Sequence, residues 1–440
     1  MSAVAAVLAG GRIAAASASA KACAATTAVA ASRMSLWAHV QQGPPDPILG
    51  LTEAYNKDTF PNKVNLGVGA YRDDEGKPHV LQCVTEAEKR LLDAHLNKEY
   101  ASIQGPKDFR DASAKLALAD ADNALAEGRV TTVQSISGTG GLRVAGIFLA
   151  QFYNFPNKDR AIYLPTPTWS NHLPIFRACG IEPRTYSYYD KNTCGLDFKG
   201  MMQDLDKLEN GSVVLLHACA QNPTGVDPTP EQWHEIATLI KQKNHLPVFD
   251  MAYQGFASGD YDKDAYAVRH FCEQGMLPFV IQSYSKNMGL YGERVGALNV
   301  VTTDPQQASA IESQLKIMIR ALYSNPPIHG ARIVATVLND NDLHALLLKE
   351  THAMADRITS MRTRLVEELA KAGSKLDWSH IQRQIGMFCF SGLTEQEVQE
   401  LISTYHIYLT KNGRISMAGV SSGNVEYLAH AMHAVTAHRE

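Results

Sequence analysis

Short apolar runs alternate with helical patterns from about residue 70 to residue 296, and this alternation constrains the fold more than any other feature. Several runs contain no polar residue, as expected where helices cover both faces of a parallel sheet. Strand–helix alternation of this kind predicts a large, doubly wound, mostly parallel α/β domain. The strands that we expect are Thr131–Ile136, Ala161–Leu164, Ser212–His217, Pro247–Phe249, Phe279–Gln282 and Val295–Val301.

The last hundred residues follow a different pattern, which predicts a smaller α+β domain. Residues 342–372 form a long amphipathic stretch, and an apolar strand candidate follows at 385–390. Thr394 and Glu397 have the spacing of a capping box that opens another helix. Asn412-Gly413, between the apolar runs 407–409 and 415–417, predicts a tight hairpin. Near the other end of the chain, the proline-rich segment 43–51 is typical of an arm that lies on a neighbouring molecule.

Composition and charge exclude several classes of function. Of the 440 residues, 45% are hydrophobic and 20% are charged, and the net charge is −4. Because the sequence has no Lys/Arg tract, nucleic-acid binding has no electrostatic support. Once the Ala-rich start is set aside, no apolar run is long enough to span a membrane. The 7 cysteines are scattered and odd in number, which favours free thiols in a reducing compartment over disulfides or a metal site.

The first 33 residues are rich in Ala and Ser, contain Arg12, Lys21 and Arg33, and have no Asp or Glu. Basic, acid-poor N-termini of this kind are typical of organelle transit peptides. The segment favours a mitochondrial address over a plastid one, and an extension without any address is the alternative. We therefore leave residues 1–33 out of the fold.

Three successive strand ends carry polar residues that suit one cofactor. Lys286 follows the strand at 279–282, at the sheet edge where α/β proteins bind ligands, and an amine there can form a Schiff base with an aldehyde. Asp250 ends the strand at 247–249, and Asn222 lies in an Asn-Pro-Thr-Gly turn beyond 212–217. Singly, these are a loop lysine, a helix cap and a turn residue. Together they predict a pyridoxal phosphate site, in which Asp250 keeps the ring nitrogen protonated while Asn222 and Tyr253 donate to the phenolic oxygen.

The cofactor phosphate requires donors and positive charge. Ser137-Gly138-Thr139 lies between a strand and a helix, so backbone N–H groups and the helix dipole face an anion there. Ser283 and Arg294 add a hydroxyl and a guanidinium. A dinucleotide fingerprint fails because Arg143 stands where a third glycine is required, and a Walker A motif fails because no Gly-Lys-Ser/Thr follows. A site for a single phosphate group fits these residues best.

From about Ser35 to its C-terminus, the chain resembles the aspartate aminotransferases of the fold-type I pyridoxal-phosphate class, in particular their mitochondrial form. The resembling segments are 43–50, 64–72, 222–225, 250–256, 324–327 and 413–416. The resemblance implies a homodimer whose chain is divided into an arm and part of a small domain at 34–76, a large cofactor-binding domain at 77–350 and a small C-terminal domain at 351–440. It also implies a mitochondrial matrix location.

The resemblance also assigns roles to individual residues. Lys286 becomes the Schiff-base lysine and proton shuttle, and His172 supports Asp250 from behind. Arg414 binds the substrate α-carboxylate, and Arg320 reaches across the dimer interface to the side-chain carboxylate. The implied catalytic residues are Lys286, Asp250, Tyr253 and Trp169. The implied cofactor-binding residues are Ser137, Gly138, Thr139, Trp169, His172, Asn222, Asp250, Tyr253, Ser283, Lys286, Arg294 and, from the other subunit, Tyr100. The implied substrate-binding residues are Gly69, Trp169, Asn222, Arg320 and Arg414.

Some of these roles depend entirely on the resemblance. Without it, Trp169 is an ordinary core residue, Tyr100 a surface tyrosine and Arg320 a solvated cation near a helix end. Ser285 departs from related mitochondrial enzymes, which often have Ala before the lysine, but Ser also occurs in the family.

The activity that the resemblance implies is a reversible ping-pong transfer of the amino group between L-aspartate and 2-oxoglutarate, giving oxaloacetate and L-glutamate. The resemblance leaves kynurenine open as a secondary substrate. The alternatives are another pyridoxal-phosphate reaction, such as decarboxylation, and a non-catalytic fatty-acid-binding role.

Overall fold

The computed structural model describes residues 37, 39–43 and 49–440. Contacts divide the chain into residues 1–50 and residues 51–440, and the fold below is that of the second unit. The predicted transit segment, residues 1–33, lies outside the described residues, as do residues 44–48 of the predicted arm.

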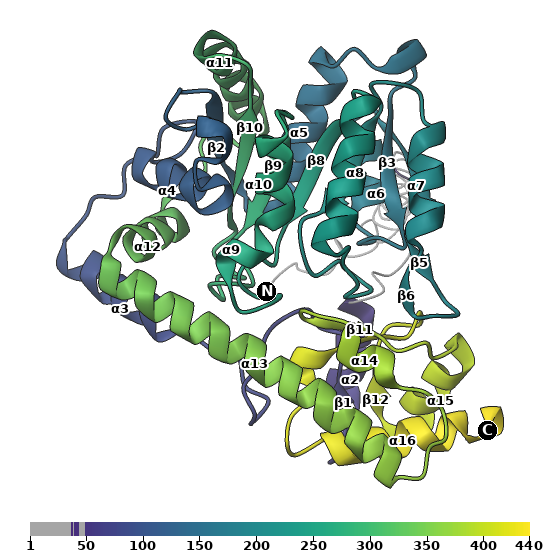
Figure 1. The fold of residues 1–440 in the computed structure, drawn as a ribbon. Coiled ribbons are helices and arrows are strands. Elements are labelled where there is room, and N and C mark those ends of the chain that lie inside the picture. The colour runs from purple at the N-terminus through teal and green to yellow at the C-terminus, as the bar shows by residue number, and fades with distance from the viewer. Residues whose placement is uncertain (1–36, 38, 44–48) are drawn as a thin grey trace, which may run out of the picture. The chain divides into compact units, whose positions relative to one another are not determined.

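A seven-stranded sheet carries the larger group of elements, in the order β2-β10-β9-β8-β7-β3-β4 (Figure 1). Neighbouring strands are parallel except at β10, which is antiparallel to both β2 and β9. All six predicted strands are confirmed, and β4 completes the sheet. Their bounds are β2 Val130–Ile136, β3 Ala161–Thr166, β4 Glu182–Ser187, β7 Val213–His217, β8 Leu246–Met251, β9 Phe279–Ser283 and β10 Val295–Val301.

Helices cover both faces of this sheet because its central strands are apolar on both sides. In β7, Val213 and Leu215 belong to one hydrophobic cluster, whereas Val214 and Leu216 belong to another. Successive side chains of a strand point to opposite faces, so these two clusters are the two sides of the sheet. The predicted doubly wound α/β architecture is therefore confirmed. One side packs on α5 Ser137–Phe152, α6 His172–Arg177 and α11 Pro305–Leu322, and the other on α7 Phe198–Lys207, α8 Pro230–Gln242 and α10 Tyr266–Glu273.

The smaller group of elements combines segments from both ends of the chain. β1, near the N-terminus, pairs in parallel with β12, and β11 pairs antiparallel with β13. Figure 1 shows β1 among the C-terminal elements, although more than three hundred residues separate them in sequence. The bounds are β1 Val64–Asn65, β11 Phe388–Phe390, β12 Ile407–Tyr408, β13 Arg414–Ser416, α14 Ser379–Arg383, α15 Glu395–Tyr405 and α16 Val425–Thr436. The predicted strand at 385–390 is thus shorter than expected, and the capping box of Thr394 and Glu397 is confirmed.

The hairpin predicted at Asn412-Gly413 is wrong. The backbone does turn there, since the amide of Gly413 donates to the carbonyl of Thr410 over 2.9 Å. However, Gly413 has a φ of 79°, whereas Asn412 does not have a positive φ. The type I′ hairpin that favours Asn-Gly requires positive φ at both central residues. The flanking strands instead separate, because β12 and β13 each find a different partner.

The helix α13, Asn341–Lys371, extends from one group of elements to the other (Figure 1). Toward its N-terminus, the carboxylate of Glu350 accepts hydrogen bonds from the amides of Gln82 (2.6 Å) and Cys83 (3.0 Å) and thereby caps α3. Toward its C-terminus, the fully buried Arg362 donates to the carbonyl of Ile381 over 2.9 Å. The remaining bounds are α2 Leu49–Lys57, α3 Gln82–Asp93, α4 Lys107–Leu118, α9 Tyr261–Asp264, α12 Ile328–Asn339, β5 Tyr189–Asp190 and β6 Gly195–Leu196.

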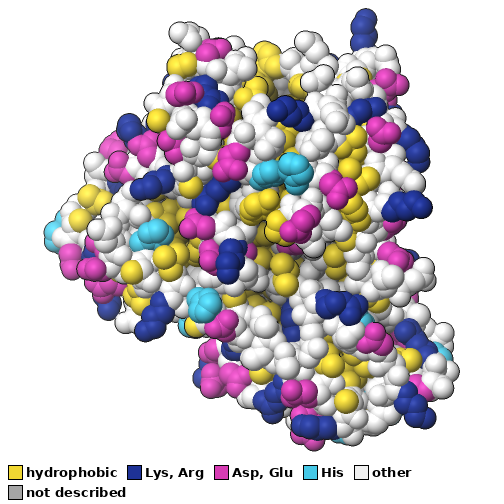
Figure 2. Space-filling model, in the orientation of Figure 1, with side chains coloured by type: hydrophobic (Ala, Val, Ile, Leu, Met, Phe, Trp, Pro, Cys, Tyr) yellow, Lys and Arg dark blue, Asp and Glu magenta, His cyan; other side chains and the backbone are white. Residues whose placement is uncertain are grey.

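The surface carries charged side chains of both signs. On the face shown in Figure 2, basic and acidic side chains are interspersed, and neither sign forms a broad continuous patch there. Among the described residues, no helix combines the length and apolar character that a membrane crossing requires. The same residues contain no group of three or more His, Cys, Asp or Glu arranged to hold a metal ion.

Candidate active site

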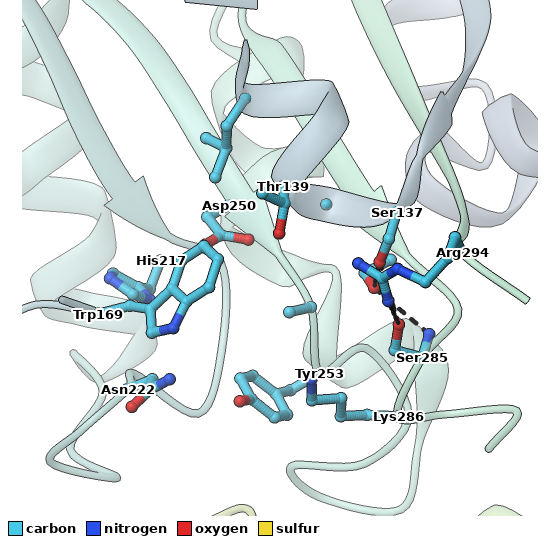
Figure 3. A pocket seen from close by; sticks show the side chains of 14 residues that line it. Ser137, Thr139, Trp169, His217, Asn222, Asp250, Tyr253, Ser285, Lys286 and Arg294 are labelled. Carbon is cyan, nitrogen blue, oxygen red and sulfur yellow. Dashed lines mark hydrogen bonds between the residues drawn. The ribbon is translucent and has the colours of Figure 1, made fainter. Parts of the chain in front are cut away.

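A cavity of about 190 Å³ opens where the strands of the large sheet end. Lys286 follows β9, Asp250 lies in β8 and Asn222 follows β7, so three neighbouring parallel strands deliver these side chains to one place. Ten of the predicted site residues line this cavity: Ser137, Gly138, Thr139, Trp169, Asn222, Asp250, Tyr253, Ser283, Lys286 and Arg294. In Figure 3, Ser137, Ser285 and Arg294 lie together at one end, whereas Trp169, His217 and Asn222 lie at the other.

The carboxylate of Asp250 is supported from behind by a histidine. Nε2 of the fully buried His172 lies 3.0 Å from Oδ2 of Asp250. Burial raises the pKa of Asp250, but the hydrogen bond from His172, with the nearby His217 and Lys286, outweighs burial and holds the pKa below its ordinary value. Asp250 is therefore a carboxylate that keeps its charge inside the protein. Such a group can hold a proton on a ligand nitrogen.

Lys286 is a buried amine whose proton affinity is reduced. Burial, and then the nearby positive charge of Arg294, lower the pKa of Lys286 to about 8 from an ordinary value of 10.5. Its Nζ atom lies 5.6 Å from the centre of the Tyr291 ring. A lysine of this kind supplies a neutral, nucleophilic amine much closer to neutral pH than an exposed lysine does.

Hydroxyl groups and a guanidinium gather at the opposite end of the cavity. Oγ of Ser137 lies 2.9 Å from Oγ of Ser283 and 3.0 Å from Oγ of Ser285, and Arg294 donates to Ser285 over 3.4 Å. Ser137 is also the first residue of α5, so unpaired N–H groups of that helix point toward the same end. This arrangement of hydroxyl donors, a guanidinium and a helix N-terminus suits an anion such as phosphate.

The backbone at this anion site is held in strained conformations. Ser137 has a φ of 58° and Arg294 a φ of 52°, which only glycine adopts readily. Strain of this kind costs about 1–3 kcal/mol per residue and persists where the surroundings impose it. Gly296 permits a close approach of the backbone here, because a Cβ atom at that position would lie 2.9 Å from Cα of Ser137. A larger residue at position 296 would therefore displace the segment that carries the Ser137 hydroxyl.

Arg414 lies beside the cavity, held from three directions. Its Nη2 donates to the carbonyl of Gly67 over 2.9 Å, its Nη1 lies 3.4 Å from Oδ1 of Asn222, and its guanidinium carbon sits 4.1 Å from the centre of the Phe388 ring. Gly69 lies against the same ring, since a Cβ atom there would approach Phe388 to 3.1 Å. Among the described residues, Nε of Arg414 has no hydrogen-bond partner. A buried guanidinium with a free donor suits an incoming carboxylate.

Two predicted residues, Tyr100 and Arg320, are not brought to this cavity. The Tyr100 side chain is 88% exposed. Arg320, near the end of α11, is exposed and donates to Ser324 and, over 3.3 Å, to Asn325. Ile317 and Leu322 on the same helix are also exposed, at 64% and 41%. Exposed apolar side chains beside an arginine are a composition that protein interfaces favour.

Sequence analysis missed four residues that line the cavity: Leu142, His217, Ala252 and Ser285. Ser285 was noted only as a departure from related sequences, yet it bonds both Ser137 and Arg294. His217 joins a chain of hydrogen bonds, because Oγ1 of Thr168 lies 3.1 Å from His217 and 2.8 Å from His172. The available signals were the position of Ser285 next to Lys286 and of His217 at a strand end.

Residues 61–432 match the family described as aminotransferase class I and II, and the chain belongs to this family. It is 56% identical over 409 residues to the mitochondrial aspartate aminotransferase of Gallus gallus, covering 93% of this chain and 96% of that protein.

Solved structures are also similar to the chain. A mitochondrial aspartate aminotransferase from Trypanosoma brucei matches with a TM-score of 0.84 and 45% identity, covering 88% of this chain and 100% of that one. An aromatic-amino-acid aminotransferase from Burkholderia pseudomallei, covalently bound to pyridoxal phosphate, matches with a TM-score of 0.88 and 43% identity, covering 91% and 99%.

Proposed function

We propose that this chain is a pyridoxal-phosphate-dependent aspartate transaminase, which exchanges an amino group reversibly between L-aspartate and 2-oxoglutarate to give oxaloacetate and L-glutamate. The observation that carries the proposal is the meeting of Lys286, Asp250 and Asn222 in one cavity. The 56% identity to the chicken aspartate aminotransferase supports the choice of reaction. Because both substrates use the same site in turn, the expected kinetics are ping-pong.

The cavity fits pyridoxal phosphate at both of its ends. The charged, buried Asp250 suits the protonated ring nitrogen, and the cluster of Ser137, Ser283 and Arg294 at the start of α5 suits one phosphate. Gly138 and Thr139 would add backbone and hydroxyl donors, Tyr253 and Asn222 would hold the phenolic oxygen, and Trp169 would cover the ring. When bound, the cofactor supplies an electron sink for the electrons of the substrate Cα–H bond.

Lys286 is the proposed proton carrier. Its amine would hold the aldehyde carbon of the cofactor and, once freed by the substrate amine, could take the proton from the substrate Cα. Its pKa of about 8 leaves an appreciable neutral fraction near physiological pH. Burial keeps the amine at the cavity and away from bulk solvent.

Selectivity for dicarboxylates is assigned to two arginines. Arg414, whose Nε has no partner among the described residues, is positioned for the α-carboxylate that all the substrates share. Gly69 and Asn222 lie beside it and complete the proposed substrate site. Arg320 is proposed to bind the second carboxylate in the site of a partner subunit. A forked, charge-assisted pair at each end would select a four- or five-carbon diacid.

The partner is proposed to be a second copy of this chain. The exposed Tyr100 would then reach the phosphate of the other subunit's cofactor, and the exposed face of α11 would lie in the interface. Mixing an inactive variant with one that is impaired at low aspartate concentration tests this. In a hybrid dimer of Lys286→Ala and Arg320→Ala subunits, one site regains both groups, so about a quarter of the activity should return after subunit exchange. Continued inactivity of demonstrated hybrid dimers would place Arg320 outside the neighbouring site.

The domain bounds and the location are part of the same proposal. Residues 1–33 are assigned to a transit peptide, 34–76 to an arm and part of the small domain, 77–350 to the large domain and 351–440 to the small domain. The mitochondrial relatives support the mitochondrial matrix as the location, with a plastid as the alternative. Import of the full chain, but not of residues 34–440, into isolated mitochondria tests the role of the first segment.

An absorbance spectrum of the holoprotein tests the proposed reaction directly. Adding L-aspartate without an oxo acid should shift the visible band of the bound cofactor into the near ultraviolet and release one oxaloacetate per site. A band that ignores aspartate but responds to phenylalanine would keep the cofactor and overturn the role of Arg320. Absence of any band, even after pyridoxal phosphate is added, would overturn the whole proposal. Kynurenine transamination stays a prediction, which the same experiment with kynurenine addresses.

A further inference from the structure

Residues 67–74 form a strap that connects the two groups of elements beside the active site. At its start, the carbonyl of Gly67 accepts a hydrogen bond from Arg414 over 2.9 Å. In its middle, the amide of Tyr71 donates to the hydroxyl of Tyr291 over 2.8 Å. The Tyr291 ring in turn faces Nζ of Lys286 at 5.6 Å. The strap therefore contacts Arg414 directly, and it contacts Lys286 through Tyr291.

Arg357, in the middle of α13, holds the other end of this strap. Its Nε donates to the hydroxyl of Tyr71 over 2.7 Å, and its Nη2 donates to the carbonyl of Arg72. Its guanidinium carbon also lies 4.8 Å from the centre of the Tyr71 ring. The Tyr71 ring is buried and packs edge-on against Phe256. This packing and the hydrogen bond from Arg357 together hold the ring in place. Charge-assisted hydrogen bonds are the stronger ones in proteins, and here they converge on one aromatic side chain.

The same guanidinium binds the segment that follows β13. Nη1 of Arg357 donates to the carbonyl of Val420 and Nη2 to that of Ala418, both over 3.0 Å. A second link runs parallel to these, because the carboxylate of Asp74 accepts hydrogen bonds from the amide and the hydroxyl of Ser422. The segment 418–422 begins two residues after the strand that carries Arg414. One arginine thus ties the strap and the Arg414 strand into a single unit.

We propose that Arg357 is a positioning residue of the substrate site, which fixes the strap through Tyr71 and so sets the placement of Arg414 against the substrate carboxylate. Arg357 does not line the cavity, so it acts only through these neighbours. The kinetic part of this inference rests on the proposed function, whereas the structural part does not.

The test compares Arg357→Gln and Tyr71→Phe with Lys349→Gln, an exposed position on the same helix. Hydrogen exchange of a peptide covering residues 67–74 should be faster in both strap variants, while a peptide covering β8 stays unchanged. In the holoprotein, KM should rise for aspartate and for 2-oxoglutarate alike, by about tenfold or more in Arg357→Gln and by less in Tyr71→Phe. The double variant should be no worse than Arg357→Gln, because both act through one contact. Lys349→Gln should match the unaltered protein.

Two results would overturn the inference. Faster exchange with KM values within about twofold of the unaltered protein would make Arg357 a purely structural residue. Unchanged exchange in both variants would show that the strap does not depend on Arg357. If Arg357→Gln does not fold, the KM values of Tyr71→Phe test the prediction, because that variant loses only one oxygen atom. Failure of the proposed function is distinguishable, since the unaltered protein would then lack aspartate turnover while the exchange comparison still applies.

Discussion

Nε2 of His172 lies 3.0 Å from Oδ2 of Asp250, and only the Asp250 side chain, which is 9% exposed, reaches the cavity. The pair keeps the pKa of the Asp250 carboxyl below its ordinary value despite burial, so a negative charge persists at one end of the cavity. In the proposed function, a persistent charge there would hold the ring nitrogen of pyridoxal phosphate in its protonated form, on which the electron-sink chemistry of the cofactor depends.

Replacing that charge with a neutral side chain of the same shape should remove most of the activity. In Asp250→Asn, kcat for aspartate should fall by about a hundredfold or more, because the lost charge-assisted interaction acts on the reacting ring. His172→Asn should lower kcat less, since the carboxylate remains. The measurement is a single-turnover rate followed by the cofactor absorbance. An Asp250→Asn enzyme as fast as His172→Asn would contradict the assignment.

Removal of the reactive amine should stop turnover altogether. Lys286→Ala leaves the phosphate end of the cavity intact, so the protein should still bind pyridoxal phosphate, but without a covalent bond to the chain. Denaturation followed by gel filtration should then separate all the cofactor from the variant, whereas borohydride treatment should fix it to the unaltered protein. Steady turnover by Lys286→Ala, coupled to oxaloacetate reduction, would eliminate the mechanism.

Cofactor capture by the apoprotein should depend on pH through Lys286. The pKa of this amine is about 8 in the fold, lower than its ordinary value of 10.5, so the reactive neutral form accumulates as pH rises through 8. The rate of covalent capture should therefore increase with pH below about 8 and level off above it.

The same shift affects stability. Between about 8 and 10.5 the unfolded chain binds the proton more readily than the folded apoprotein does, so apoprotein stability should rise with pH in that window. Stopped-flow absorbance measures the capture rate, and denaturant titration of the apoprotein measures the stability. A capture rate still rising steeply at pH 10 would mean that the amine is not perturbed. Lys349, an exposed lysine of the same chain, provides the reference when its labelling rate is measured in parallel.

Replacing Arg414 and replacing Arg320 should affect KM for different sets of substrates. Arg414→Lys should raise KM for every amino acid tested, because a lysine cannot replace the forked contact with the shared α-carboxylate. Arg320→Val should raise KM for aspartate and glutamate by about tenfold or more, and it should leave phenylalanine unaffected or improved. Initial rates with the three amino acids provide the comparison. Equal losses with aspartate and phenylalanine in Arg320→Val would remove that residue from side-chain recognition.

The sequence predicted the strands and the residues at their ends because both depend on local patterns. Short apolar runs that are bounded by turn residues and alternate with helical patterns favour buried strands, and residues such as Asp250 and Asn222 stand out where a run ends. The position of Ser285 next to Lys286 is a local signal for the cavity, but its contacts with Ser137 and Arg294 join segments far apart in sequence and have no local pattern. The Asn412-Gly413 hairpin failed because local turn chemistry does not say which strand will be the partner. No local sequence pattern predicts the role of Arg357, because its contacts join segments far apart in sequence.

The 31-residue helix α13 extends from the large group of elements into the small one. At 1.5 Å per residue it is about 46 Å long, so a pivot near its middle by about 5° moves either end by about 2 Å. Arg357 lies near the middle of the helix, whereas Glu350 and Arg362 anchor it on either side. Because these contacts bind α13 to both groups of elements, a small tilt of this one helix would shift both groups at once.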